Sequence, residues 1–189
     1  MSIWIEKYRP QSLDDILLAP STKKILKNIL ESPNIHSDFT NLLFTGSPGC
    51  GKTTSGKFIP KVLRLPSLYI NASEENGIEV LRTKIKDFAT SQTIDNKLKI
   101  VIIDESDGTT PAFQSACRNV IESTYKTTRY IFTANYPDKI IAPLHSRLKE
   151  IVFGEIEEKL VLKRVLEILK AENIEIPKEQ GTNLVTLIK

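Results

Sequence analysis

The stretch Gly46-Ser47-Pro48-Gly49-Cys50-Gly51-Lys52-Thr53 decides how this chain folds. The residues just before it, 41–45, read Asn-Leu-Leu-Phe-Thr and predict a short buried strand, and a helical pattern begins at Lys52. A strand, a glycine-rich turn and a helix N-terminus in this order form a cradle for the phosphates of a nucleotide. The alternative is a chance glycine-rich turn before a helix. Because both flanking elements are present, the pattern favours a phosphate-binding loop.

The residue types in this loop suit phosphate chemistry. Its glycines let backbone N–H groups curl around phosphate oxygens without a clash from Cβ atoms, and the positive end of the helix dipole points at the same oxygens. We expect Lys52 to reach the β- and γ-phosphates of ATP, and the Thr53 hydroxyl to bind Mg²⁺. The predicted nucleotide-binding residues of the loop are Gly46, Ser47, Pro48, Gly49, Cys50, Gly51, Lys52, Thr53 and Thr54.

A second part of the site is predicted about fifty residues downstream. Residues 99–105 form an apolar, β-branched run that ends in Asp104 and Glu105, as expected of a buried parallel strand. Ligands bind at the carboxyl ends of such strands. We expect Asp104 to hold the Mg²⁺ shell and Glu105 to orient and deprotonate the attacking water. An acidic loop after a strand is common by itself, so this reading depends on the phosphate-binding loop upstream.

A third apolar strand, residues 130–134, delivers Asn135 at its end. Asn in this position is more often only a turn residue. Here it follows the other two motifs, and an amide could lie between the γ-phosphate and the water. The combined arrangement resembles that of AAA+ ATPases, which implies Asn135 as a further catalytic residue.

The N-terminal segment narrows this resemblance. Residues 4–10, Trp-Ile-Glu-Lys-Tyr-Arg-Pro, followed by Leu-Asp-Asp-Ile at 13–16, resemble the signature of replication factor C small subunits and phage clamp-loader ATPases. Leu-Leu-Ala-Pro at 17–20 is more similar to the phage branch. The resemblance implies that Tyr8, Arg9 and Pro10 fold over the adenine.

Two further segments are similar to the same family. Ser146-Arg147, after a turn at Pro143, could be a solvated surface pair, but it resembles the pair that projects an arginine finger into the neighbouring subunit's ATP site. Residues 71–89 resemble the DNA-facing helix, and residues 114–122 the central helix that couples the ATP site to DNA. On charge alone the former would be an ordinary solvated helix face. The DNA contacts implied are Ser73, Gly77, Arg82, Lys86 and Arg118.

Bulk properties set limits on the class of protein. The 189 residues allow one sizeable α/β domain, and 40% hydrophobic residues suffice for a packed core. A net charge of +3 does not by itself indicate nucleic acid. The two cysteines and two histidines lack metal-ligand spacing, which argues against a zinc or disulfide framework and agrees with a reducing cytoplasm. No signal peptide or long apolar span is recognised, so no membrane partner is expected.

Alternating strands and helices predict a five-stranded parallel sheet flanked by helices, an α/β fold of the AAA+ phosphate-loop class. The expected domains are a nucleotide-binding domain at 1–153 and a partial helical lid at 154–189, without the family's collar. Strands are predicted at 41–45, 67–71, 99–103, 130–134 and 150–153, and helices at 21–30, from 52, and at 77–90, 111–123 and 157–172, with a short last helix after Gly181. Pro60 should kink the second helix or end it early, since it lacks the N–H for an interior bond.

These features lead to one expected function and two alternatives. We expect an ATP- and Mg²⁺-dependent clamp-loader subunit that acts with other loader subunits, a sliding clamp and primer–template DNA, in the cytoplasm of a phage host or other cell, or in a nucleus. A non-hydrolysing regulatory paralogue is one alternative. Another AAA+ remodeller, such as a helicase loader, is the second. Intact Lys52, Asp104 and Glu105 argue against the first, and the N-terminal segment with Ser146-Arg147 against the second.

Overall fold

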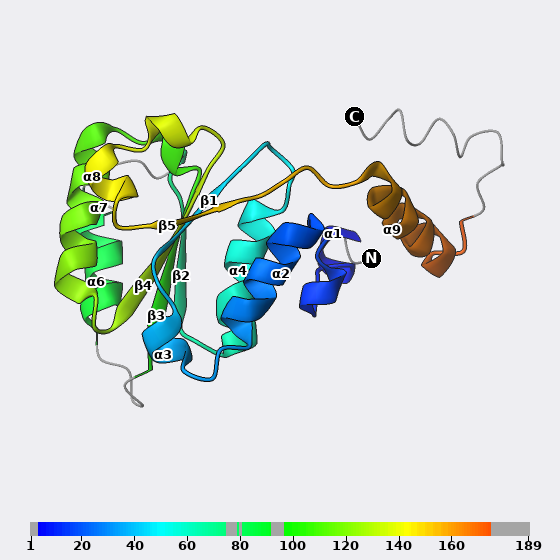
Figure 1. Cartoon of the computed structure of the whole chain (residues 1–189), viewed down its shortest axis with the longest axis horizontal. Coiled ribbons are helices and arrows are strands. Elements are labelled where there is room, and N and C mark those ends of the chain that lie inside the picture. The colour runs from blue at the N-terminus through cyan, green and yellow to red at the C-terminus, as the bar shows by residue number, and fades with distance from the viewer. Residues whose placement is uncertain (1–3, 75–78, 80, 92–96, 175–189) are drawn as a thin grey trace.

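A computed structural model describes residues 4–74, 79, 81–91 and 97–174, and its centre is one parallel β-sheet (Figure 1). The strand order is β2-β3-β4-β1-β5, and all four neighbouring pairs are parallel. This confirms the predicted sheet. The strands are β1 (Leu42–Thr45), β2 (Ser67–Asn71), β3 (Lys99–Asp104), β4 (Thr128–Ala134) and β5 (Lys149–Val152).

The central strands are buried on both faces, as their apolar sequences require. All residues of β3 and β1 are buried. Successive side chains point to opposite faces, so Val101 and Ile103 enter one core cluster while Ile100 and Ile102 enter the other. Helices α6, α7 and α8 cover the first cluster, and α2 and α4 lie on the opposite face (Figure 1).

The helices lie close to their predicted positions. Helix α7 begins after Thr110, whose side chain accepts a hydrogen bond from the Phe113 N–H, as expected of an N-cap residue. The α-helices are α1 (Trp4–Lys7), α2 (Pro20–Leu30), α3 (Ile35–Asp38), α4 (Lys52–Leu63), α6 (Lys86–Thr90), α7 (Pro111–Thr124), α8 (Ala142–His145) and α9 (Glu158–Ala171). Short 3₁₀ turns lie at Leu13–Asp15, Ser106–Gly108 and Pro137–Lys139.

A kink or an early end of α4 was expected at Pro60, and the helix does not end there. The helix continues through Pro60 to Leu63 and is closed by Arg64, which has the left-handed φ of 52°. The Leu65 N–H donates to the Pro60 carbonyl at 3.0 Å, as in a helix C-cap. Pro60 lies only one turn before the end of the helix and is buried, so packing compensates for the hydrogen bond that its missing N–H cannot make.

The helix predicted over 77–90 is not one regular α-helix. In its described part, Leu81–Ile85 is π-helical and α6 follows from Lys86 to Thr90. The predicted helix is therefore confirmed over 81–90, but side-chain periodicity does not distinguish an i→i+5 from an i→i+4 bonding pattern over so few residues. The helix predicted after Gly181 lies outside the described residues.

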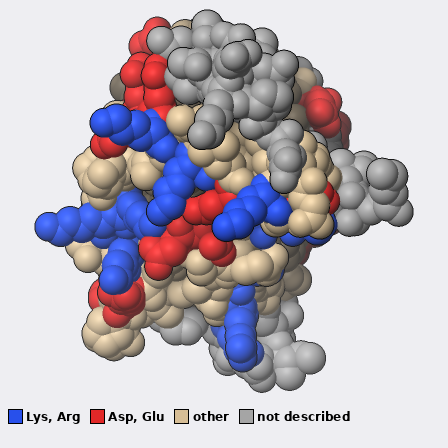
Figure 2. Space-filling model, turned by 90° about the vertical axis from the view of Figure 1, so that its right-hand side faces the viewer, with Lys and Arg blue, Asp and Glu red and all other residues tan. Residues whose placement is uncertain are grey.

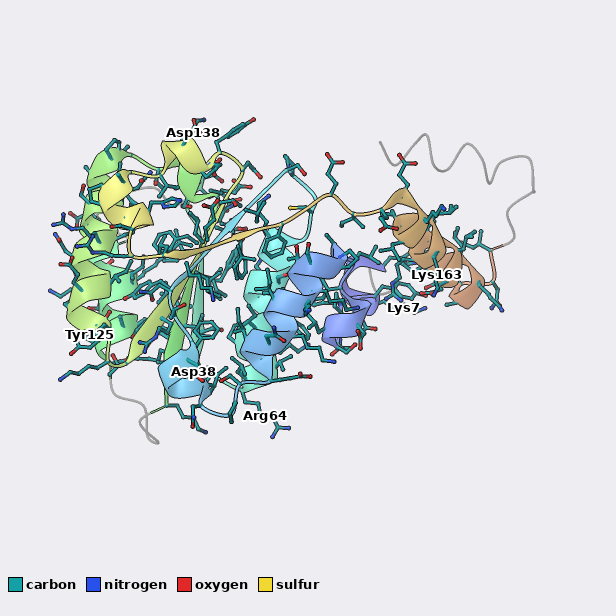
Figure 3. The ribbon with its side chains drawn as sticks, viewed as in Figure 1. Lys7, Asp38, Arg64, Tyr125, Asp138 and Lys163 are labelled. Atoms are coloured by element: carbon teal, nitrogen blue, oxygen red, sulfur yellow. The ribbon has the colours of Figure 1, made fainter. Side chains whose placement is uncertain are left out.

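The N-terminal segment meets the far end of the chain. After β5 the backbone runs out as an extended segment to α9, which lies beside α1 at one end of the molecule (Figure 1). Lys7 lies between the two helices (Figure 3), and its Nζ is 2.6 Å from Glu172 Oε1. The Tyr8 hydroxyl donates to the same oxygen at 2.6 Å. We call these three residues the clasp. In the part of the chain that is described, no helix has the length and apolar character needed to cross a membrane.

Candidate active site

The glycine-rich loop after β1 has a backbone that only glycine adopts easily at its two ends. Gly46 has a φ of 141°, and a Cβ added there would lie 2.4 Å from the Phe153 carbonyl oxygen. Gly51 has a φ of 95°, and its added Cβ would lie 2.8 Å from Leu18 Cδ2. The loop therefore packs closely against the segments on either side and leads directly into the N-terminus of α4.

Lys52 is the first residue of α4 and is only 7% exposed. Its Nζ donates to the carbonyl oxygens of Gly46 at 2.8 Å and Ser47 at 2.7 Å. The ammonium group is therefore folded back over its own loop, where the helix dipole also favours an anion. The predicted contact between Lys52 and phosphate oxygens stays a prediction, and this placement keeps the ammonium group at the phosphate loop.

Asp104, the last residue of β3, is the most heavily hydrogen-bonded carboxylate of the site. It is 4% exposed and accepts hydrogen bonds from three hydroxyl groups. The Thr53 hydroxyl lies 2.8 Å from Oδ1 and 3.0 Å from Oδ2. The Thr133 hydroxyl, from β4, donates to Oδ1 at 2.5 Å, and the Tyr69 hydroxyl, from β2, donates to Oδ2 at 2.8 Å.

This donor set fits Mg²⁺. A hydroxyl and a carboxylate side by side are hard oxygen ligands, and Mg²⁺ bound with a nucleotide needs only one or two of them besides phosphate oxygens and water. No group of three or more His, Cys, Asp or Glu side chains suited to a metal occurs among the described residues. Thr53 and Asp104 would thus hold the ion together with the phosphates, as the sequence predicts.

Glu105 differs from its neighbour in backbone conformation. Its φ of 54° and ψ of 41° are left-handed, which is uncommon outside glycine and is often found at active sites. The Glu105 N–H donates to Thr133 Oγ1 at 3.0 Å, and the Gly108 N–H donates to the Glu105 carbonyl at 3.0 Å. The turn directs an exposed carboxylate to the same edge of the sheet as the phosphate loop.

One cavity of about 240 Å³ brings the predicted parts together. Asn135 follows β4, and its N–H donates to Asp107 Oδ2 at 3.1 Å, which joins the ends of β3 and β4. The residues lining this cavity are Pro48, Gly49, Gly51, Lys52, Thr53, Thr54, Glu105, Thr133, Ala134 and Asn135. Loop, carboxylate and amide therefore share one space large enough for phosphates and water.

The N-terminal segment adds a second cavity next to the first. It measures about 410 Å³ and is shared by Tyr8, Arg9 and Pro10 with Thr53, Thr54, Lys57, Phe58 and Lys61 of α4. A third cavity, of about 520 Å³, lies between the loop and the start of α9, with Leu17, Ser47–Cys50 and Val161 among its lining residues. Both adjoin the phosphate loop, and Tyr8, Arg9 and Pro10 line the smaller of the two; that they fold over the adenine stays a prediction.

Arg147 lies away from these cavities. Its Nε donates to Glu122 Oε1 of α7 at 2.7 Å, and Nη2 forms an ion pair with the same oxygen. Nη1 donates to the Pro143 carbonyl at 2.6 Å. The structure therefore brings Arg147 to α7 and not to the phosphate loop of its own chain.

The predicted DNA contacts are placed unevenly. Gly77 lies outside the described residues, and for Arg82 only the backbone, in the π-helical stretch, is described. Ser73 bonds Asn71 Oδ1 through both its N–H, at 3.2 Å, and its hydroxyl, at 2.9 Å. Lys86 is exposed at the start of α6, and Arg118 is half-buried on α7, 4.0 Å from Glu122. Their role in DNA binding stays a prediction.

Sequence reasoning missed two residues of the site, Thr133 and Tyr69. Each carries a hydroxyl on a strand that neighbours β3, and each hydroxyl lies close to the carboxyl end of β3. A polar side chain near the end of an otherwise apolar strand is the only signal that could have suggested them. Threonine and tyrosine are common in strands for packing reasons, so that signal is weak.

The Tyr69 hydroxyl is a donor in this site. Burial, followed by the hydrogen bond to Asp104, raises the pKa of Tyr69 above its usual range. The phenol therefore stays protonated at neutral pH. Lys57 Nζ lies 3.5 Å from the centroid of the Tyr69 ring, so a cation from α4 covers the aromatic face.

Comparisons with known proteins agree with this geometry. Residues 42–156 match the model of the family described as "ATPase family associated with various cellular activities (AAA)". The chain is 40% identical to replication factor C subunit 4 of Homo sapiens over 96% of this chain and 53% of that protein. It is 38% identical to the replication factor C small subunit of Methanococcus vannielii, over 93% of this chain and 56% of that protein. The resemblance predicted from the motifs is confirmed.

The chain spans about half the length of the curated relatives it matches. Among solved structures, it is similar to RuvB, the Holliday junction branch migration motor of Thermotoga maritima, with a TM-score of 0.76 and 19% identity. That match covers 92% of this chain and 58% of RuvB. At this identity the likeness supports the fold alone.

Proposed function

Because the chain belongs to the AAA family of ATPases, we propose that it is an ATP-hydrolysing subunit of a clamp loader. The main support is that the phosphate loop, Asp104, Glu105 and Asn135 meet at one edge of the sheet. The chain in which they meet is 36–40% identical to replication factor C subunits. We further propose that hydrolysis releases a sliding clamp and primer–template DNA from the assembled loader.

Each residue of the site has a part in this proposal. The loop amides and Lys52 bind the triphosphate, while Tyr8, Arg9 and Pro10 line the cavity for the base. Thr53 and Asp104 hold Mg²⁺, which when bound neutralises charge on the phosphate oxygens. Glu105 orients the attacking water and accepts its proton.

Asn135 adds an amide next to the same water. It lines the phosphate cavity together with Glu105, so its side chain can respond to the presence of the γ-phosphate. In the proposal, this contact links the nucleotide to the end of β4 and, through Asp107, to the turn after β3.

Arg147 serves the neighbouring subunit in this proposal. Its ion pair with Glu122 keeps it on α7, away from the phosphate loop of its own chain. An arginine supplied to a phosphoryl-transfer site is worth about a thousandfold or more in rate. Glu122 would have to release Arg147 when two subunits meet.

DNA binding is proposed for Ser73, Gly77, Arg82, Lys86 and Arg118. In this proposal, the backbone amides at the helix start and the cationic side chains contact phosphates and not base edges. Such contacts bind any sequence, which suits a protein that acts at any primer end.

A mixing experiment tests the proposal in the assembled complex of full-length subunits. Arg147→Ala subunits keep an intact phosphate loop, and Lys52→Ala subunits keep an intact Arg147. Neither variant alone should hydrolyse ATP at the wild-type rate, but mixed assemblies should recover activity that primed DNA and clamp stimulate. Mixed assemblies that stay inactive would refute the role of Arg147 in the neighbour's site.

A further inference from the structure

The carboxylate of Asp104 is fixed from both sides of its strand. β3 lies between β2 and β4, and each neighbour supplies one hydroxyl group: Thr133 to Oδ1 and Tyr69 to Oδ2. The terminal torsion of an aspartate side chain is soft, so rotamer preference alone does not set the plane of its carboxylate. Hydrogen-bond donors on both oxygens do set the plane of the carboxylate.

Tyr69 is the less replaceable of the two donors at Oδ2. Without its hydroxyl, Oδ2 would keep only the longer contact to Thr53, at 3.0 Å. Oδ1 would keep the Thr133 hydroxyl, but Thr53 would be the sole donor left at Oδ2, although its own oxygen also has to face the metal. Because Tyr69 donates to Oδ2, the Thr53 hydroxyl can donate to Oδ1, at 2.8 Å, while its oxygen faces the metal.

The ring of Tyr69 is itself held in place. β2 is an edge strand and Tyr69 is 37% exposed, so the core does not confine the side chain. Lys57 covers the ring at 3.5 Å, one helical turn after Thr53 on α4. Tyr69 thus connects α4 to the end of β3 across the open edge of the site.

We propose that Tyr69 is a positioning residue for the metal shell, which orients Asp104 so that Mg²⁺ strengthens nucleotide binding. This rests on the proposed function, in which Thr53 and Asp104 hold the ion. A partner that orients a metal ligand is typically worth about tenfold to a hundredfold in metal affinity.

The test compares nucleotide affinity with and without the metal. A fluorescent ATP analogue is titrated into the chain in excess MgCl₂ and in EDTA, and the ratio of the two dissociation constants gives the strengthening by Mg²⁺. Tyr69→Phe removes the hydroxyl but keeps the ring under Lys57. We expect the ratio to fall by about tenfold, with the affinity in EDTA unchanged.

Tyr130→Phe is the matched control. It deletes a hydroxyl that bonds Thr124 in the core, away from the site. It should lower the melting temperature but leave the Mg²⁺ ratio as in the wild type. An unchanged ratio in Tyr69→Phe, or an equal fall in both variants, would overturn the role of Tyr69 while the proposed function stands. Failure of the wild-type chain to bind the analogue in MgCl₂ would overturn both.

Discussion

At the scale of single residues, Thr133 connects the backbone of Glu105 to the carboxylate of Asp104. Its hydroxyl accepts a hydrogen bond from the Glu105 N–H at 3.0 Å and donates one to Asp104 Oδ1 at 2.5 Å. Thr133 therefore contributes both to the left-handed turn at Glu105 and, with Tyr69 and Thr53, to the carboxylate plane of Asp104.

Thr133→Val keeps the shape of the side chain and removes both hydrogen bonds. We expect the rate of ATP hydrolysis to fall by about tenfold or more, because hydrogen bonds to charged groups contribute about 1.5–3 kcal/mol. ATP affinity should change less, because Asp104 Oδ1 keeps the Thr53 hydroxyl at 2.8 Å. Steady-state kinetics separate the two effects.

Thr128→Val is the control for this prediction. It makes the same change at the other end of β4, where the hydroxyl bonds the Ala89 carbonyl at 3.3 Å. A similar loss of activity in both variants would mean that Thr133 matters only for the stability of the strand.

At the scale of elements, the strands were predicted well and the irregular helix was not. Apolar runs such as 100–103 identify buried strands directly, and the residues at strand ends place Asp104, Glu105 and Asn135 at one edge. The π-helical turn at Leu81–Ile85 depends on how the segment packs, which periodicity over a few residues does not reveal. For the same reason, the sequence did not predict the contacts of Tyr69 and Thr133 across strands.

The C-terminal end of α6 contacts a buried lysine, Lys99, which is the first residue of β3. The sequence predicted only its place at the start of a strand. Lys99 is 1% exposed, and its Nζ donates to the carbonyl oxygens of Phe88 and Ala89, each at 2.7 Å, and of Ser91. A cation at a helix C-terminus also interacts favourably with the helix dipole. Lys99 thus fixes the helix that is proposed to face DNA onto β3.

Lys99→Met should destabilise the fold, because the apolar stem remains while buried carbonyl oxygens lose their donor. We expect the free energy of unfolding to fall by about 2–3 kcal/mol, as measured by denaturant titration. Lys24→Met on the exposed surface of α2 should have almost no effect. If both variants were equally stable, the Lys99 hydrogen bonds would not support the helix end.

At the scale of the whole molecule, the clasp joins segments that lie more than 160 residues apart. It ties the N-terminal segment, which borders a cavity together with α4, to the end of α9. This end of the molecule carries basic and acidic side chains close together (Figure 2). No sequence pattern indicated that Glu172 would meet Lys7 and Tyr8, since the contact depends on how α9 packs back on α1.

The clasp should open in acid. The hydrogen bond from Lys7, followed by that from Tyr8, lowers the pKa of Glu172 below its ordinary value of 4.5. The ionised Glu172 carboxylate therefore stabilises the clasp at pH values above its ordinary pKa. This stabilisation is lost as the pH falls through the lowered pKa and the carboxylate becomes protonated. Trp4, the only tryptophan, packs edge-on against Tyr8 with ring centroids 6.4 Å apart, so its fluorescence should report the opening.

Glu172→Gln should shift the Trp4 emission to the red at pH 7, toward the value that the wild type reaches in acid. Glu167→Gln, on the same helix but paired with Arg164, is the control and should keep the wild-type emission at pH 7. Circular dichroism at each pH separates opening of the clasp from unfolding. Identical emission from wild type and Glu172→Gln at pH 7 would show that the clasp does not hold the N-terminal segment.

One sheet edge is proposed to bind ATP through the phosphate loop and to hydrolyse it through Glu105. The most direct measurement determines the affinity for Mg²⁺–ATP and the identity of the bound nucleotide in two variants. Glu105→Gln should bind ATP as tightly as the wild type and retain it unhydrolysed. Lys52→Ala should lose affinity by about tenfold to a hundredfold, since it removes a charged donor to the phosphates. Equal losses of ATP affinity in both variants would contradict this division of roles.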